Sequence, residues 1–89
     1  MDVTLNALRR FLNQSGCIEA RVLHDPGSAT IFIELRCERK TGASCRAVVA
    51  LDRQMPFVPE RVLKKIGRDL APCLGRGWQT RIPQEDPFG

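Results

Sequence analysis

The sequence contains no tyrosine, one histidine, one tryptophan and no apolar run long enough to cross a membrane. His24 stands beside Asp25 in a turn-like stretch, and no serine or cysteine has a base at recognisable spacing, so the groups for nucleophilic catalysis are missing. No Cys-x-x-Cys or Cys/His pairing is present, so we expect no metal and no cofactor. These absences predict a protein that is not an enzyme.

The N-terminus also lacks a basic stretch followed by an apolar one, as a secretory leader would have. We therefore expect a cytoplasmic protein that does not contact a membrane. Four cysteines would suggest a disulfide framework in a short secreted chain, but in the cytoplasm we expect free thiols that pack as small hydrophobes. These residues are Cys17, Cys37, Cys45 and Cys73.

Eighty-nine residues, 43% of them hydrophobic and 27% charged, suffice for one domain with its own core and a single binding surface. We expect that domain to cover residues 1–83, followed by a loose C-terminal tail over residues 84–89. The net charge is +4, and it is unevenly placed, because residues 53–81 hold seven cations against two anions. The basic character is therefore local to the second half of the chain.

Apolar periodicity predicts an α+β fold with the order α-β-β-β-α, in which an antiparallel sheet of three or four strands carries both helices on one face. The expected helices cover residues 4–13 and 59–72, the expected strands 18–22, 31–38 and 45–51, and an optional fourth edge strand 78–82. The first strand is expected to bury Ile18, Ala20 and Val22. The predicted centre of the core is Leu8, Ile33, Val49, Ile66 and Leu70.

A three-residue loop at 40–42 sets the second and third strands in a register where every inward pair is apolar or thiol. The same register places Arg36 opposite Arg46, where Glu34 and Glu38 are expected to neutralise them diagonally. The expected inward pairs are Ile31–Leu51, Ile33–Val49, Leu35–Ala47 and Cys37–Cys45.

A basic stripe is the main candidate site. Its residues, Arg61, Lys64, Lys65 and Arg68, are spaced i, i+3, i+4 and i+7 and so share one face of the second helix, opposite an apolar face. No acid at alternating spacing relieves their repulsion, which favours an anionic partner, either phosphates or an acidic protein patch. The alternative is a solvated helix face.

Two further sets of residues are secondary candidates. Trp78 lies between Arg76 and Arg81 in a glycine-containing segment, where it could stack on a base or anchor in a partner's pocket. We favour a third interpretation, in which its ring closes one end of the core. Phe32, Arg36 and Arg46 share the outward face of the sheet with Arg21 and with Glu19, Glu34 and Glu38. An apolar centre of Phe32, Leu23, Val48 and Ala50 ringed by ion pairs is typical of a small protein interface or a homodimer.

The order α-β-β-β-α over residues 4–74 resembles the double-stranded RNA-binding domain. That resemblance implies a second helix that presents its cations to phosphates. It is one of element order, because residues 56–61 stand where the family has a glycine-rich loop and a Lys-Lys-x-Ala-Lys motif. In size and single-domain build the chain is also similar to small phage and mobile-element proteins such as anti-CRISPRs.

Two functional hypotheses follow. In the first, the chain is a non-catalytic inhibitor or adaptor that docks on a protein of the nucleic-acid machinery. In the second, it binds DNA or RNA directly and with little sequence specificity through the basic stripe, with help from Arg76 and Arg81. The neutral sheet face and the short stripe favour the protein target.

Overall fold

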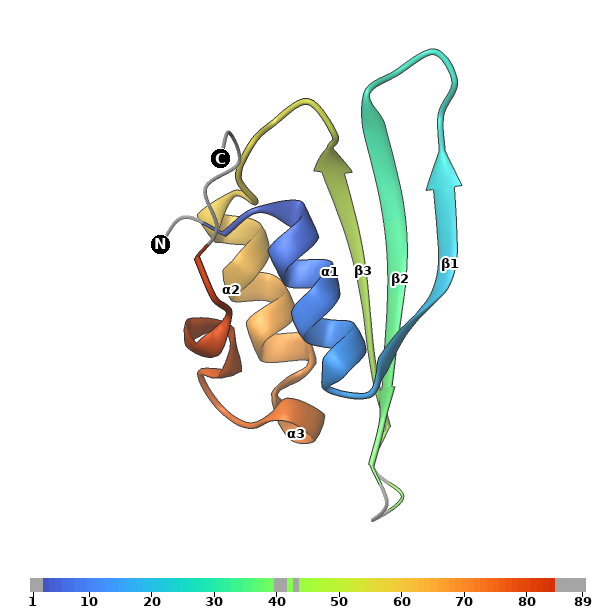
Figure 1. Ribbon diagram of the computed structural model, residues 1–89. Helices are drawn as coiled ribbons and strands as arrows, with labels where there is room; N and C mark the ends of the chain where they lie inside the picture. Colours follow the sequence, from blue (N-terminus) through green and yellow to red (C-terminus); the bar gives the residue numbers. More distant parts are fainter. Residues whose placement is uncertain (1–2, 40–41, 43, 85–89) are drawn as a thin grey trace.

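The computed structural model describes residues 3–39, 42 and 44–84 and has an α+β fold, as predicted (Figure 1). The predicted tail residues 85–89 and the loop residues 40 and 41 lie outside the described part. No helix in the described ranges is long and apolar enough to cross a lipid bilayer. The elements are α1 (Leu5–Gln14), β1 (Cys17–His24), β2 (Thr30–Glu38), β3 (Ser44–Asp52), α2 (Glu60–Asp69), α3 (Ala71–Leu74) and the 3₁₀ helix η1 (Trp78–Arg81).

Within the described residues the sheet has three antiparallel strands in the order β1-β2-β3. The predicted register between β2 and β3 is confirmed at all four inward pairs, Ile31–Leu51, Ile33–Val49, Leu35–Ala47 and Cys37–Cys45. Every one of these side chains is buried, because alternation of period two sends them all to the same face. The predicted opposition of Arg36 and Arg46 is confirmed as well.

A β-bulge in β1 makes the predicted faces wrong for the residues that precede it. Val22, after the bulge, lies opposite the inward Ile33 as predicted, but it is 44% exposed and not buried as expected. The register to β2 shifts between Glu19 and Arg21, so Ala20 is the extra residue and the residues before it change sides. Ile18, expected inward, lies opposite the outward Arg36 and is 61% exposed, whereas Glu19 lies opposite the inward Leu35. In β1 the buried side chain is that of Cys17.

Both helices lie on one face of the sheet, as expected, and the β1–β2 hairpin extends beyond them at its turn (Figure 1). Helix α1 begins where the Thr4 hydroxyl accepts a hydrogen bond of 3.0 Å from the Ala7 amide, a common N-cap. The predicted core centre is confirmed: its members are at most 4% exposed and comprise Leu8, Ile33, Val49, Ile66 and Leu70.

The C-terminal segment differs from the expectation of an edge strand. Helix α2 ends at Asp69, and Pro72 does not close it but sits in the first turn of the short helix α3. Gly75 and Gly77 have φ values of +94° and +74°, which glycine adopts freely and which turn the chain back toward the core. Residues 78–81 then form one 3₁₀ turn, because burial of Trp78 outweighs the strand-like alternation of the segment.

Candidate binding surfaces

Helix α2 displays the predicted basic stripe on its exposed side. Leu63 and Ile66 are buried beneath the helix, whereas the four cations of the stripe are exposed. Lys65 differs from the other three because its ammonium group already has partners in the protein. Its Nζ lies 2.9 Å from Asp69 Oδ2 and donates to the Val48 carbonyl at 3.2 Å. The expectation that no acid relieves the stripe is therefore wrong: Asp69, four residues on, pairs with Lys65.

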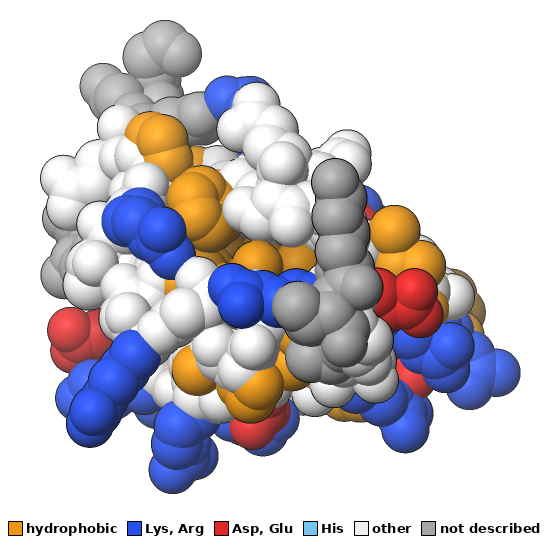
Figure 2. Space-filling view, turned by 90° about the horizontal axis from the view of Figure 1, so that it is seen from below, with side chains coloured by type: hydrophobic (Ala, Val, Ile, Leu, Met, Phe, Trp, Pro, Cys, Tyr) orange, Lys and Arg blue, Asp and Glu red, His pale blue; other side chains and the backbone are white. Residues whose placement is uncertain are grey.

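An open groove of about 920 Å³ runs along this stripe, between α2 and the segment that joins α3 to η1. Arg76 lines the groove together with the stripe, and no acidic side chain is among its lining residues. Small residues, Gly67, Ala71 and Gly77, bring backbone close to the groove. Seen from below, Lys and Arg side chains project from many points of this end of the molecule, and few Asp and Glu side chains are visible between them (Figure 2). The groove is thus a cationic surface suited to an anionic ligand.

Gln79 packs against Gly67 on one side of this groove. A Cβ atom added at Gly67 would lie 2.7 Å from Gln79 Cδ, so glycine at this position makes room for the amide. The Oε1 atom of Gln79 is buried and has no hydrogen-bond partner among the described residues. The sequence signal for this contact was an isolated glycine inside a helix.

Trp78 is a core residue, as favoured from the sequence. Its side chain is 0% exposed, stacks on Phe11 with ring centroids 5.8 Å apart, and donates from Nε1 to the Gly67 carbonyl at 3.1 Å. The ring therefore has no accessible face for a nucleobase or a partner's pocket. It also supplies a hydrogen bond to one of the last carbonyls of α2.

Arg81 has a structural partner as well. Its Nη2 donates to the Leu74 carbonyl at 2.7 Å, and Arg39 donates to the Cys73 carbonyl, so two arginines satisfy the end of α3. Arg81 does not line the basic groove. The structure thus brings Arg76 to the stripe and holds Arg81 at the other side of α3.

The outer face of the sheet carries the predicted apolar centre. Leu23, Phe32 and Ala50 are neighbours across the three strands, and Val48 lies opposite Glu34. A shallow hollow of about 190 Å³ lies over this centre. The large apolar side chains remain substantially exposed: Leu23 51%, Phe32 43% and Val48 47%. No helix of the described residues covers this face (Figure 1).

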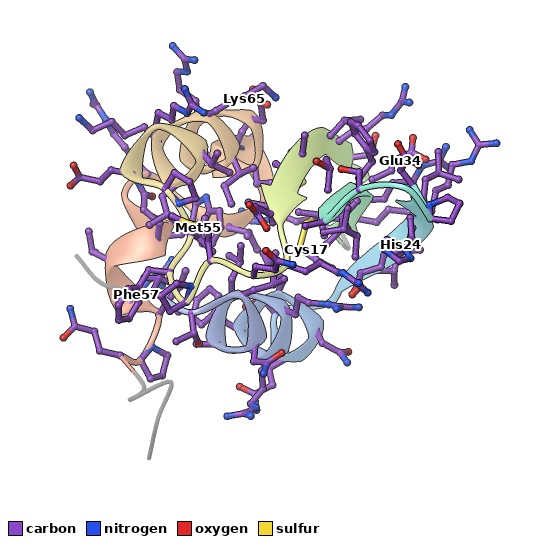
Figure 3. The ribbon with its side chains drawn as sticks, turned by 90° about the horizontal axis from the view of Figure 1, so that it is seen from above. Cys17, His24, Glu34, Met55, Phe57 and Lys65 are labelled. Atoms are coloured by element: carbon purple, nitrogen blue, oxygen red, sulfur yellow. A yellow bond between two sulfur atoms is a disulfide. The ribbon has the colours of Figure 1, made fainter. Side chains whose placement is uncertain are left out.

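Glu34 organises the charges beside that centre (Figure 3). Its Oε1 atom lies 2.5 Å from Arg46 Nε on the neighbouring strand, which confirms the expected diagonal pair for Arg46. The same atom lies 3.7 Å from Arg36 Nη2, two residues along β2. Glu19 was expected here too, but the bulge turns it to the helix side, where its carboxylate accepts hydrogen bonds of 2.7, 2.8 and 3.2 Å from Arg9. Hydrogen bonding to Glu19 raises the pKa of Arg9. The outer face therefore has fewer acids than expected.

The cysteines are the feature that the sequence did not reveal. Cys17 and Cys37 form a disulfide, so the expectation of four free thiols is wrong for this pair. The bulge explains the error, because it places Cys17 on the inner face directly opposite Cys37, with Cα atoms 4.2 Å apart. Cys45 and Cys73 are buried and remain thiols. The described residues contain no group of three or more acidic, cysteine or histidine side chains arranged to hold a metal ion.

Comparison of the chain with models of protein families, with curated proteins and with solved structures finds no match. The similarity to the double-stranded RNA-binding domain therefore stays one of element order. The two surfaces have to be interpreted from their own geometry.

Proposed function

We propose that this protein is a non-catalytic binding module that docks on a protein partner through the outer face of its sheet. From its size we expect an inhibitor or adaptor of the phage or mobile-element kind, similar to anti-CRISPRs. It would act in the cytoplasm on a nucleic-acid-handling complex. The observation that carries it is the cluster of half-exposed Leu23, Phe32 and Val48 on a sheet face without a covering layer.

The apolar centre supports binding by its size and surroundings. Fully burying one such side chain is worth about 1.5–3 kcal/mol, so covering the exposed half of these three would contribute roughly 3 kcal/mol in total. Charged pairs around an apolar centre are the usual anatomy of a modest protein interface. The centre would then supply affinity, and the charged rim would select the partner.

The charge of the rim indicates the kind of partner. Arg21 and Arg46 line the hollow with one carboxylate, that of Glu34, which also lies near Arg36, so cations outnumber acids beside the apolar centre. An apolar patch edged by acids on the partner would be complementary to it. Enzymes that act on nucleic acids contain such acidic surfaces where carboxylates hold catalytic metal ions. This is the basis for proposing a partner in the nucleic-acid machinery.

Capture with paired variants tests the proposal. Tagged wild-type protein and Phe32→Asp/Val48→Asp would be compared in lysate of the source cells, with bound proteins quantified by mass spectrometry. Lys64→Glu/Arg68→Glu serves as the control that leaves the outer face intact. A partner that is lost with the first variant and kept with the second is the expected result. The proposal fails if no protein depends on the outer face, or if purified protein forms a dimer that Phe32→Asp/Val48→Asp dissociates.

A cytoplasmic site of action adds one requirement. The cytoplasmic thiol pool keeps most disulfides reduced, so the Cys17–Cys37 bond has to be dispensable for the fold there. Circular dichroism with and without a reductant should give the same spectrum and a folded protein at 37 °C. Unfolding on reduction would contradict the cytoplasmic location.

Direct nucleic-acid binding is the second candidate function, and the acid-free lining of the basic groove favours it. With Lys65 committed to Asp69, the available cations are Arg61, Lys64, Arg68 and Arg76, so the slope of log affinity against log salt should be about −3 to −4. Fluorescence polarisation with single-stranded and duplex probes measures that slope. Lys64→Glu/Arg68→Glu should abolish binding, whereas Arg21→Glu/Arg53→Glu, with the same net charge away from the groove, should weaken it much less.

A further inference from the structure

All four cysteines lie together at one end of the inner face of the sheet. Cys17 on β1 is bonded to Cys37 on β2, and Cys37 lies opposite Cys45 on β3. Cys73 on α3 completes the group, since its Sγ donates to the Cys37 carbonyl at 3.5 Å. Figure 3 shows Cys17 on the side of the sheet that faces the helices. The four side chains are between 2% and 9% exposed, so they form one buried cluster.

The two thiols of the cluster are partners of one another. The thiols of Cys45 and Cys73 are hydrogen-bonded. Burial, together with that hydrogen bond, raises the pKa of Cys73 to about 11. The cluster therefore contains one formed disulfide and one adjacent dithiol, and Cys37 contacts both.

We infer that the four cysteines form a thiol–disulfide exchange centre, in which one disulfide moves between the Cys17–Cys37 position and the Cys45–Cys73 position. This inference does not depend on the proposed function. No external oxidant or reductant is needed, because the number of disulfides stays the same.

The exchange takes two balanced steps. One thiol of the Cys45–Cys73 pair loses its proton, and the thiolate attacks Cys37 Sγ; a mixed disulfide forms, the Cys17–Cys37 bond breaks, and Cys17 leaves as a thiolate that takes up a proton. The second thiol of the pair then loses its proton, and its thiolate attacks the sulfur of the first thiol, which is now bonded to Cys37 in the mixed disulfide. The Cys45–Cys73 bond forms, and Cys37 leaves as a thiolate and is protonated.

The two positions hold different elements together. The first bond fastens the edge strand β1 to β2 just before the bulge, and the second would fasten β3 to α3. After exchange, the Arg9–Glu19 ion pair between α1 and β1 remains as a tie for the start of β1. The exchange would thus remove the covalent link between an edge strand and its neighbour without a change in net oxidation state, while the β1–β2 ladder stays in place.

The rate should rise with pH, because both thiols of the pair must ionise in the course of the exchange. The cluster opens on a recess of about 310 Å³ beside α3. Charged groups facing Cys73 or lining this recess are Arg39, which lowers the pKa of Cys73, Glu38 and Arg81. Since the pKa of Cys73 stays near 11, the rate should increase about tenfold per pH unit up to that value.

Peptide mapping tests the inference on the intact protein. Trypsin cuts between all four cysteines, so each one falls in a separate peptide and every pairing has its own mass. Protein carrying only the Cys17–Cys37 bond would be kept for a day without oxygen, added thiol or added disulfide, at pH 7 and pH 9. It would then be quenched with acid, alkylated and digested. The Cys45–Cys73 peptide pair should appear, about a hundredfold faster at pH 9, at a rate independent of protein concentration.

Two variants make the outcome decisive. The Cys73→Ser protein should keep the Cys17–Cys37 bond, because it lacks one of the two sulfurs of the Cys45–Cys73 bond. Cys17→Ser, oxidised with glutathione disulfide, should form the Cys45–Cys73 bond, which shows that this position can close. Retention of Cys17–Cys37 alone at both pH values would overturn the inference, as would exchange that scales with protein concentration or a Cys17→Ser variant that cannot form the second bond.

Discussion

Replacing Trp78 by phenylalanine tests whether the only tryptophan closes the core or serves a partner. The ring is 0% exposed, and its Nε1–H donates to the Gly67 carbonyl at 3.1 Å. The substitution leaves that buried carbonyl without this donor, at a cost of about 1–3 kcal/mol. The smaller ring leaves a void worth roughly another 1 kcal/mol. We expect Trp78→Phe to lower the free energy of unfolding by about 2–4 kcal/mol in total.

That loss is large for a domain of this size, whose total stability should be on the order of 5–13 kcal/mol. The melting temperature should fall by roughly 10–25 °C. Urea unfolding has to be followed by far-ultraviolet circular dichroism, because the variant lacks the only tryptophan. Phe32→Leu, a change on the exposed outer face, is the matched control and should change stability by less than about 0.5 kcal/mol. A Trp78→Phe loss as small as the control's would refute a core role for the ring.

Three further predictions concern local contacts. Gly67→Ala should change stability by less than about 1 kcal/mol in urea unfolding, because the obstructing Gln79 amide is the end of a flexible side chain and alanine favours the helix; a loss above about 2 kcal/mol would mean that Gln79 cannot move. Arg9→Met should cost no more than about 1 kcal/mol, since its ion pair with Glu19 is partly exposed, and high salt should reduce the difference between the two proteins. Folding raises the pKa of Cys73 from 9.0 to about 11, so the contribution of its thiol to the free energy of unfolding is complete below pH 9 and is lost as pH rises through about 11. Between pH 9 and 11 a Cys73→Ala protein should therefore lose less stability than the wild-type protein does, as measured by urea unfolding.

The pairing of β2 with β3 was predictable because apolar and polar residues alternate along both strands. Once the apolar side of each strand is placed inward, the face of every other residue follows. The same reasoning failed on β1, where one extra residue at Ala20 reverses the faces of the positions before it. Nothing in the alternation marks a bulge, since Ile18 and Val22 are both apolar and fit an unbroken strand equally well. The missed disulfide follows from this single error, because an unbroken strand would not send Cys17 inward.

Other errors came from side chains whose partners lie outside their own element. The pairing of Lys65 with Asp69 was visible in the sequence as an i, i+4 pair, but the second contact of Lys65, with the Val48 carbonyl, depends on how α2 packs on β3. The fold of residues 78–82 depends on burial of Trp78 against Phe11, across most of the chain length. The exposed apolar centre around Phe32 was predictable, because it follows from the register alone.

Photo-crosslinking at two positions is the most direct test of docking through the outer face. A benzophenone amino acid would replace Phe32 in one protein and Lys64 in another, and each would be irradiated in the source cells. Position 32 should give an adduct with a protein, at a single mass, that Val48→Asp abolishes, and position 64 should give less of it. Nucleic-acid adducts at position 64, with no protein adduct at position 32, would contradict the proposed function and favour the basic groove as the working surface.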